Sequence, residues 1–244
     1  MSKQHQTTYY PESKFGGFVD GDEVISFYTR VHNFLDESTV VLDVGCGRGE
    51  FIDEPIPARR EYRTLKGKCG RVIGIDVDPV AAENPNLDEF HRLDDGPWPL
   101  PDASIDVCVS DYVLEHFETP EVFFSECQRV LKPGGYLFFR TSNLFSYLGL
   151  AVKLIPRRLH NRILGQVQPD RQEEDIFPTV YRCNTLGQIR RMLDKYGFEH
   201  SVYGYQAVPG YLGFSRLTYY LGMLYMKFMP KALKIHIIAL ARKR

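Results

Sequence analysis

The sequence predicts an α/β protein built on a doubly wound parallel sheet, and three observations support this fold class. Short apolar segments alternate along the chain with segments of helical spacing. Each short segment runs directly into glycine, proline or an acidic residue, as parallel strands covered on both faces do. The 244 residues, 43% of them hydrophobic and 25% charged, suffice for one such domain with an added cap.

The strands of this sheet are expected at the short apolar runs. The first is Val-Val-Leu-Asp-Val at residues 40–44, and three more are expected at 71–77, 105–109 and 136–140. Residues 235–240 (Ile-His-Ile-Ile-Ala-Leu) have the composition of a final strand that returns to the sheet. Ligands of such sheets bind beyond the carboxyl ends of the strands, so functional residues are expected directly after each strand.

Three helices are expected around these strands. The first covers residues 22–35 and carries apolar residues at helical spacing. The second covers 120–131, because Pro120 suits a first helical turn and the Pro-Gly-Gly run at 133–135 stops it. The third covers 185–196 and ends before Gly197, a suitable residue for a helix C-terminus.

Charge and cysteine usage exclude several classes of protein. The net charge of −1 argues against bulk nucleic acid as the main partner, since such proteins need a basic face. The five cysteines are scattered and form no Cys-x-x-Cys pair, so we expect neither a metal site nor a disulfide framework. This cysteine usage fits a cytoplasmic location. The polar first ten residues do not form a signal peptide, and no apolar run is a clear membrane span.

A glycine-rich loop follows the first strand. Asp43 ends that strand and leads into Gly45, Cys46, Gly47 and Gly49, whose glycines let the backbone turn sharply and approach a ligand closely. A dinucleotide fingerprint needs a further glycine three positions after Gly47. Glu50 stands there instead, so the loop disfavours NAD.

Acidic residues follow the next two strands. Asp76 ends the second strand, where a carboxylate can accept both ribose hydroxyls of a nucleoside. Asp94 and Asp95 follow the third strand region, and an acid there can accept the exocyclic amine of adenine. Val77 and Trp98 are candidate apolar walls for the same base. Each acid alone is also consistent with a solvated turn.

At the end of the fourth strand, a bound cofactor and the substrate that reacts with it are expected to meet. Ser110 follows that strand, and Asp111 and His116 are candidate bases in the next few residues. His160 is a third candidate base. A structural histidine hydrogen-bonded at a helix start is the alternative for His116.

These motifs together resemble the class I methyltransferases that depend on S-adenosylmethionine (SAM), in particular the methyltransferase type 11 group related to quinone-biosynthesis methyltransferases. The resemblance spans roughly residues 38–143 and rests on the order and spacing of five motifs. They are Leu42-Asp43-Val44-Gly45-Cys46-Gly47-Arg48-Gly49, Gly74-Ile75-Asp76, the stretch 102–106, Val113-Leu114-Glu115-His116 and Arg129-Val130-Leu131-Lys132-Pro133-Gly134-Gly135.

The resemblance implies a Rossmann-like fold, SAM as cofactor and S-adenosylhomocysteine as product. It implies that Asp43 and the loop at 45–49 border the methionine part, that Asp76 holds the ribose, that Asp94 faces the adenine and that Ser110 lines the sulfonium side. The chain departs from the family over 51–70, where two prolines are expected to break the helix after the glycine loop. It also lacks an Asn-Pro-Pro-Tyr signature after the fourth strand, which lowers the case for methylating nitrogen.

Four sections are expected along the chain. Residues 1–37 form an N-terminal arm and helix, 38–143 the SAM-binding core, 144–180 an inserted lid or cap, and 181–244 a C-terminal helix, a final hairpin and an apolar helix that complete the same domain. Arg30, on the N-terminal helix, is a candidate partner for the methionine carboxylate, although a surface position fits it equally well.

The sequence therefore favours a SAM-dependent methyltransferase acting on a small-molecule, glycan or lipid-linked acceptor, with oxygen as the favoured acceptor atom. A nicotinamide-dependent nucleotide-sugar oxidoreductase or epimerase is one alternative, and a SAM-binding module without catalysis is another. Two apolar stretches, 144–162 and 211–229, are consistent either with a cap packed on the core or with peripheral contact to a membrane.

Overall fold

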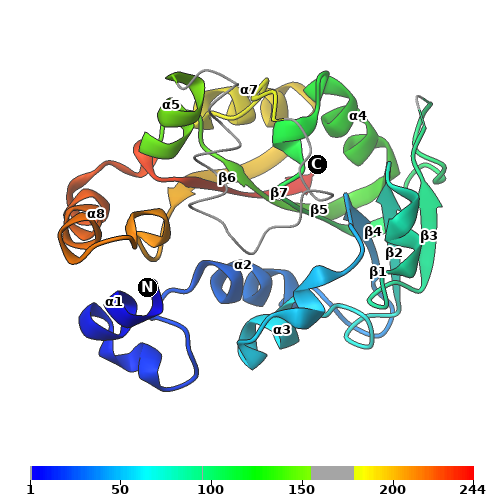
Figure 1. The fold of residues 1–244 in the computed structure, drawn as a ribbon. Helices are drawn as coiled ribbons and strands as arrows, with labels where there is room; N and C mark the ends of the chain where they lie inside the picture. The colour runs from blue at the N-terminus through cyan, green and yellow to red at the C-terminus, as the bar shows by residue number, and fades with distance from the viewer. Residues whose placement is uncertain (1, 95, 155–178) are drawn as a thin grey trace.

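The computed structural model describes residues 2–94, 96–154 and 179–244, and these form a seven-stranded sheet with helices on both faces (Figure 1). The strand order is β3-β2-β1-β4-β5-β7-β6. Neighbours from β3 to β5 are parallel, and β7 runs antiparallel to both β5 and β6. The expected doubly wound sheet is therefore confirmed, and β6 and β7 complete it as an antiparallel pair. The strands are β1 (Val40–Val44), β2 (Arg71–Asp76), β3 (Glu89–Arg92), β4 (Ile105–Asp111), β5 (Leu131–Ser142), β6 (Phe198–Tyr205) and β7 (His236–Lys243).

Two apolar clusters cover the two faces of the sheet. On one face, α4 and α7 bury phenylalanines and leucines such as Phe123, Phe124 and Leu193. On the other face, α2 buries Phe27 and Val31 against the valines of β1, β2 and β4. The described α-helices are α1 (Ser2–Tyr9), α2 (Glu23–His32), α3 (Pro57–Arg63), α4 (Pro120–Val130), α5 (Tyr147–Leu154), α7 (Leu186–Lys195) and α8 (Arg216–Phe228).

Short 3₁₀ turns connect these elements: η1 (Pro11–Lys14), η2 (Glu50–Asp53), η3 (Pro79–Glu83), η4 (Leu114–His116), η6 (Gly210–Leu212) and η7 (Lys231–Leu233). The segment after the glycine loop contains η2 and then α3, which begins at Pro57. The expected break in the helix at this point is confirmed, because proline fits only the first turn of a new helix.

Local signals explain the helix limits. The Asp22 side chain accepts hydrogen bonds from the backbone of Val24 and Ile25 and caps α2. Thr185 caps α7 in the same way, and Gly197 follows that helix with a left-handed φ of 76°. The expected helices over 22–35, 120–131 and 185–196 are confirmed within a few residues at each end.

Two strands are longer than the apolar runs suggest. β4 continues through Ser110 and Asp111, and β5 begins at Leu131 and continues to Ser142. The additional residues of β4 are polar but pair with β1 or β5, because hydrogen bonding to neighbouring strands extends a strand past the end of its apolar core. Ser110 and Asp111 therefore lie within the sheet rather than after it.

The carboxyl ends of the parallel strands lie at one edge of the sheet. β1, β2, β4 and β5 end there, and β7 begins there because His236 pairs with Ser142. We call this the carboxyl edge. Among the described residues, no helix combines the length and apolar character needed to cross a membrane.

Candidate functional site

The glycine loop turns sharply at the end of β1. Gly45 has a φ of 70° and donates to the carbonyl oxygen of Ile75 at 2.8 Å, and a Cβ added to it would meet Val113 at 2.4 Å. Gly47 also has a left-handed φ, of 52°, but a Cβ there would meet nothing within 4 Å. The loop therefore packs against Val113 at Gly45 and has free space at Gly47. A loop whose backbone approaches a ligand closely needs such free space.

Asn84 holds this loop from the other side, and sequence reasoning missed it. Its side-chain amide donates to the carbonyl oxygens of Cys46 at 2.9 Å and of Gly47 at 3.0 Å. The side chain is buried, with 4% of its surface exposed. An asparagine before Pro85 reads as a turn in a single sequence. Its contact with a loop 37 residues away could not be inferred from that pattern.

Asp76 lies against the glycine loop at the end of β2. One carboxylate oxygen accepts from the backbone N–H of Gly47 at 2.9 Å, and the other accepts from that of Asp78, also at 2.9 Å. The side chain is buried, yet only backbone donors are recorded for it. An ionised carboxylate held in this way keeps lone pairs for a further donor such as a ribose hydroxyl.

The next loop is attached to the end of β2. The N–H of Leu93 donates to the carbonyl oxygen of Asp76 at 2.7 Å, so Asp94 lies close to the end of this strand. Asp94 is exposed and accepts from the N–H of Gly96, while Val77 is 54% exposed. The structure thus brings Asp76, Val77 and Asp94 to one place, whereas Asp95 lies outside the described residues.

Trp98 does not line this place. Its side chain is 4% exposed and packs edge-to-face on Phe123 of α4, with ring centroids 6.4 Å apart. The expectation that it forms an adenine wall is wrong, because the indole fills the core beneath α4 instead.

Ser110 and Asp43 lie on neighbouring strands behind the loop. Ser110 pairs with Val44 of β1, is 1% exposed, and its hydroxyl has no partner among the described residues. Burial, together with the negative charges of Asp111 and Asp76, raises the pKa of Asp43 to about 7, although Arg63 opposes this shift. A cation placed here would stabilise the ionised carboxylate. An unpartnered buried hydroxyl beside it is a second group that a ligand could satisfy.

Arg30 is not brought to this place. It lies on the exposed side of α2, donates to the backbone carbonyl of Ser26, and is close enough to Tyr203 of β6 to act on its pKa. β6 is the edge strand farthest from the glycine loop in this half of the sheet. The suggested contact of Arg30 with a methionine carboxylate is therefore a wrong placement, and its surface alternative holds.

Asp111 is bound by two arginines. Arg140 donates to both of its carboxylate oxygens, at 2.9 and 2.6 Å, and Arg63 approaches at 3.5 Å. Tyr28 also donates to it, at 3.1 Å. Burial alone would raise the pKa of Asp111, but Arg140 and Arg63 lower it below its usual range. An ionised carboxylate with its lone pairs in use is a poor proton acceptor, so the expectation that Asp111 is a base is wrong.

Arg140 is a functional residue that sequence reasoning missed. It is 2% exposed, and its guanidinium lies over the rings of Phe27, Tyr28 and Tyr112 at 5.1 to 5.8 Å from their centroids. A signal was available, because an arginine at the end of the apolar run 136–139 must be paired if the strand is central. Its partner could not be read from the sequence.

The other candidate bases have different positions. His116 ends η4, just beyond β4, and its side chain is half-buried, so it remains a candidate. Its neighbour Glu115 is buried and accepts from Thr141 and Ser142 of β5 at 2.7 and 3.0 Å, which joins η4 to the carboxyl edge. His160 lies outside the described residues.

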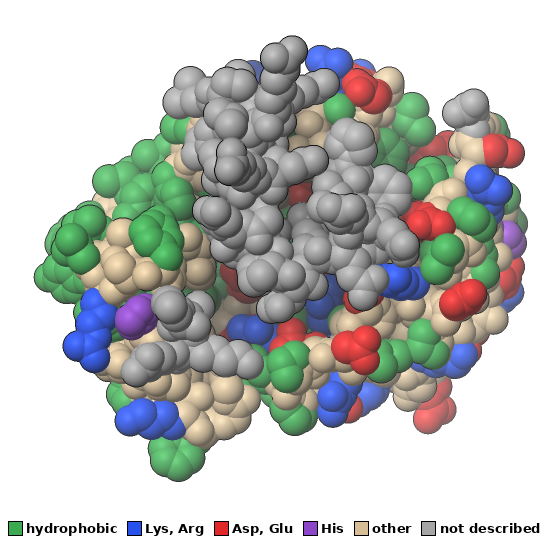
Figure 2. Space-filling view, viewed as in Figure 1, with side chains coloured by type: hydrophobic (Ala, Val, Ile, Leu, Met, Phe, Trp, Pro, Cys, Tyr) green, Lys and Arg blue, Asp and Glu red, His purple; other side chains and the backbone are tan. Residues whose placement is uncertain are grey.

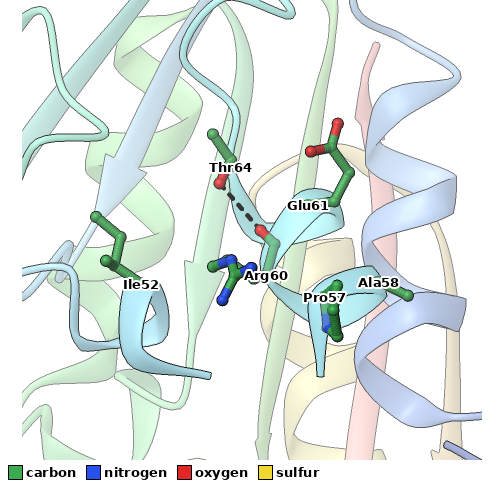
Figure 3. Close-up of a pocket in the computed structure, with 6 residues that line it drawn as sticks. All are labelled: Ile52, Pro57, Ala58, Arg60, Glu61 and Thr64. Carbon is green, nitrogen blue, oxygen red and sulfur yellow. Dashed lines mark hydrogen bonds between the residues drawn. The ribbon is translucent and has the colours of Figure 1, made fainter. Parts of the chain in front are cut away.

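A separate hollow of about 490 Å³ lies on the outer surface of η2 and α3 (Figure 3). Its lining contains Ile52, Arg60 and Glu61, and a backbone oxygen of Arg60 accepts from Thr64 at the rim. None of the acids at the strand ends contributes to it. This hollow is not the candidate site.

Part of the sequence is similar to known methyltransferases. Residues 42–139 match the family model of a methyltransferase domain. A "Probable S-adenosylmethionine-dependent methyltransferase" of Mycolicibacterium smegmatis is 38% identical over 112 residues, 44% of this chain and 39% of that protein. The malonyl-[acyl-carrier protein] O-methyltransferase of Yersinia pestis is 34% identical over 106 residues, 42% of this chain and 36% of that protein.

A longer match extends past the domain. The mitochondrial ubiquinone biosynthesis O-methyltransferase of Rattus norvegicus is 33% identical over 172 residues, 60% of this chain and 45% of that protein. The chain thus spans less than half the length of these curated relatives.

The fold is also that of solved methyltransferases. The crystal structure of a SAM-dependent methyltransferase from Mesorhizobium loti has a TM-score of 0.52 and 18% identity to this chain, and the match covers 92% of this chain and 99% of that one. At this identity the likeness shows the fold alone, which is the Rossmann-like fold of class I methyltransferases.

Proposed function

We propose that the chain is a class I SAM-dependent methyltransferase that transfers a methyl group from SAM to an oxygen atom; the match of residues 42–139 to the family model of a methyltransferase domain supports this. The observation that carries this proposal is the open cradle at the carboxyl edge. There Gly47 leaves space above the loop, and the carboxylates of Asp43 and Asp76 lie on neighbouring strands.

The residues of this cradle suit SAM, which carries a sulfonium and an ammonium charge. Asp43 gains from a nearby cation because its pKa is raised by burial and by two neighbouring carboxylates. The hydroxyl of Ser110, which has no partner among the described residues, suits the sulfonium end, and Asp76 and Asp94 suit the ribose and the adenine amine. The half-exposed side chain of Val77 suits the face of the base.

SAM supplies a methyl group that is already activated towards a nucleophile. The protein must then align the acceptor and exclude water, and alignment can supply on the order of 7–11 kcal/mol in the best cases. Oxygen is the proposed acceptor atom because two relatives are named as O-methyltransferases. The acceptor is proposed to be a small molecule, a glycan or a lipid-linked compound.

Two measurements test this function. Calorimetry with SAM, S-adenosylhomocysteine and NAD should give binding of the first two and no response to NAD. Measurable NAD binding with no response to either SAM species would favour the oxidoreductase alternative. Transfer of a labelled methyl group to a panel of phenols, alcohols, sugars and carboxylates then tests catalysis. Cofactor binding without transfer to any acceptor would favour the non-catalytic alternative.

A second proposal concerns the surface of α8. Leucine and phenylalanine side chains form a stripe along this helix at positions 217, 221, 224 and 228, and Leu217, Leu221 and Phe228 are 66%, 53% and 68% exposed. Phe214 precedes the helix and is 64% exposed, and Phe145 beside α5 is 52% exposed. Figure 2 shows hydrophobic side chains gathered at this end of the molecule.

Along the chain, the charged residues within α8 and after it are all positive. From residue 200 to the C-terminus the chain contains no Asp or Glu, and it contains seven basic residues: Arg216, Lys227, Lys231, Lys234, Arg242, Lys243 and Arg244. Exposed apolar side chains flanked by lysine suit a membrane surface that contains anionic lipid. We propose that α8 docks on such a surface and that the enzyme is cytoplasmic and membrane-peripheral. Of the other expected stretch, 144–162, the structure describes only residues up to 154.

Vesicle flotation tests this contact. The protein should float with vesicles of phosphatidylcholine and phosphatidylglycerol at low salt, and less at high salt. Leu217→Gln combined with Leu221→Gln should abolish flotation. Val122→Gln, at a similarly exposed apolar position on α4, should leave it unchanged. Absence of flotation at low salt would contradict the proposal.

A further inference from the structure

Three residues that lie far apart in the sequence form a hydrogen-bonded chain at the carboxyl edge. The hydroxyl of Tyr112 lies 2.6 Å from Nδ1 of His236, and Nε2 of His236 lies 3.2 Å from a carboxylate oxygen of Glu23. The two rings meet edge-to-face with centroids 5.5 Å apart. These hydrogen bonds join the start of α2, the end of β4 and the start of β7.

These three hydrogen-bonded residues are adjacent to the candidate cofactor site. Tyr112 is two residues beyond Ser110, which lines that site. The Tyr112 ring lies under the guanidinium of Arg140, and its N–H donates to the carbonyl oxygen of Arg140 at 3.0 Å. Tyr112 is partly exposed.

The backbone at Tyr112 is in an unfavourable conformation. Its φ of 60° is left-handed, which a bulky side chain rarely adopts. Such conformations persist where the surrounding structure imposes them, and they concentrate at active sites. Here the conformation directs the ring of Tyr112 onto His236.

The hydrogen bonds define the direction in which a proton can move. Nε2 faces a carboxylate and therefore carries the ring proton, which leaves Nδ1 as the acceptor for the tyrosine hydroxyl. The groups that act on His236 are Glu23 of α2, Asp111 of β4, Tyr112 and Arg140 of β5. Burial lowers the pKa of His236 and Arg140 adds to this, while Glu23 and Asp111 oppose it; the net shift is downward. The imidazole is therefore neutral at pH 7.

Tyr112 holds its own proton in this arrangement. Burial raises its pKa well above the usual value, the charges of Glu23, Asp111 and Tyr211 add to this, and Arg140 opposes it. The resting group is thus a neutral phenol that donates to a neutral imidazole, with a carboxylate behind it. Tyr112, His236 and Glu23 thus have the arrangement found in catalytic triads: a hydroxyl group, a base that can take its proton and a third group that orients the base.

We propose that Tyr112, His236 and Glu23 form a proton relay that deprotonates an acceptor hydroxyl, an inference that rests on the proposed methyl transfer. As the acceptor oxygen forms its bond to the methyl carbon, the bond from that carbon to sulfur breaks and its electron pair stays on sulfur. The acceptor proton moves to the Tyr112 oxygen, and the Tyr112 proton moves to Nδ1 of His236. Glu23 stabilises the resulting imidazolium, which later releases its proton to water.

The relay narrows the class of acceptor. A phenol has a pKa near 10 and is protonated at pH 7, so its methylation gains from a base by about 10²–10⁴-fold. A carboxylic acid has a pKa near 4 and is already ionised. A relay is therefore useful for an alcohol or phenol and unnecessary for a carboxylate. The acceptor is accordingly a hydroxyl compound.

Methyl transfer to two classes of acceptor tests this assignment. Catechol serves as the hydroxyl probe and a malonyl thioester as the carboxylate probe, each with labelled SAM. Tyr112→Phe, which keeps the ring under Arg140, should lower transfer to catechol about 10²-fold. It should leave S-adenosylhomocysteine affinity unchanged. Glu23→Gln should lower transfer about tenfold, and Tyr203→Phe, on β6, serves as the matched control.

The pH profile and the state of the imidazole supply readouts that a structural role would not move. The rate with catechol should fall as the pH drops through the pKa of His236, and Glu23→Gln should move this fall to lower pH because it removes a carboxylate that raises that pKa. Nitrogen-15 NMR of the protein without cofactor should show a neutral His236 protonated on Nε2.

The outcomes separate the relay from the enzyme activity. If the wild-type protein methylates only the thioester carboxylate, or if Tyr112→Phe reduces transfer to both probes equally, the relay is wrong and methyl transfer stands. A neutral ring protonated on Nδ1 would also overturn the relay, whatever the rates. If neither SAM nor S-adenosylhomocysteine binds, the proposed function fails and the relay fails with it.

Discussion

The two halves of the carboxyl edge hold their charges differently. At the ends of β1 and β2, Asp76 accepts only backbone N–H donors among the described contacts, and Asp43 has a raised pKa. At the ends of β4 and β5, Asp111 is matched by Arg140 and Arg63, and its pKa is lowered. The first half carries negative charge that a cationic cofactor can satisfy, whereas the second half satisfies its own charges.

We interpret the first half as a surface that binds the proposed cofactor, and the second half as a support that holds neighbouring side chains in place. The ionised form of a carboxylate without a positive partner is unfavourable, and a cationic ligand that supplies the partner gains binding free energy from it. A buried ion pair satisfied within the protein cannot bind strongly to anything else, but it fixes the position of its neighbours. Here those neighbours include Tyr112, which lies under Arg140.

The largest expected effect breaks the support. Arg140→Met leaves Asp111 buried beside the more distant Arg63, and the loss of one partner of a buried pair costs about 3–5 kcal/mol of unfolding free energy. Urea denaturation measures it. Arg182→Met, which removes an exposed pair with Glu118, should cost less than about 1 kcal/mol. Equal losses in both variants would show that burial of the Arg140 pair has no special weight.

The next effect is on the binding surface. Asp76→Ala should weaken S-adenosylhomocysteine binding by about 1.5–3 kcal/mol, since it removes a charged acceptor. Calorimetry measures this loss. Asp78→Ala serves as the control, because the Asp78 side chain only caps η3 by accepting from Val80. Unchanged affinity in Asp76→Ala would mean that the ribose lies elsewhere.

A pair of glycine variants sharpens the difference between strain and binding. Gly47 and Gly67 both have a left-handed φ and open space around an added Cβ. Alanine at either position should therefore cost about 1–2 kcal/mol of unfolding free energy. Only Gly47→Ala should also weaken S-adenosylhomocysteine, because its Cβ enters the cradle. If both variants bind the ligand equally, the cradle is not at Gly47.

The last effect is a pH dependence of the protein without cofactor. The pKa of Asp43 is raised to about 7, so the folded protein binds its proton more tightly than the unfolded chain does, and the associated stability is lost as pH rises from about 4 to 7. Asp43→Asn removes this loss. The pKa is raised by about three units from 3.8, and one unit corresponds to about 1.4 kcal/mol, so the variant should be more stable by up to about 4 kcal/mol at pH 8 and little changed at pH 4. Parallel pH curves for variant and wild type would contradict a raised pKa.

Local patterns predicted much of the fold. β1 has the limits expected from its apolar run, and α4 begins at Pro120 as expected. The apolar run at 235–240 also forms a strand of the sheet, β7. These features depend on strand period, helix period and capping, which neighbouring residues in the chain determine.

The errors share one physical cause. Trp98 and Arg30 are single side chains whose surroundings come from other parts of the chain, and both lie away from the positions expected for them. Asp111 was expected to be a base because its partner Arg140, 29 residues later, is not visible in a local pattern. A pKa depends on these distant partners and on burial, so it cannot be read from a motif.

The sequence by itself determined the half of the edge that carries the glycine loop and Asp76. The loop at 45–49 and the acid at Asp76 each belong to a single strand and the turn after it, so spacing along the chain is enough to specify them. Only the tertiary structure decided the other half. Glu23, Tyr112 and His236 meet because α2, β4 and β7 pack at one edge, and contacts between residues 124 and 213 positions apart depend on that packing rather than on any local pattern.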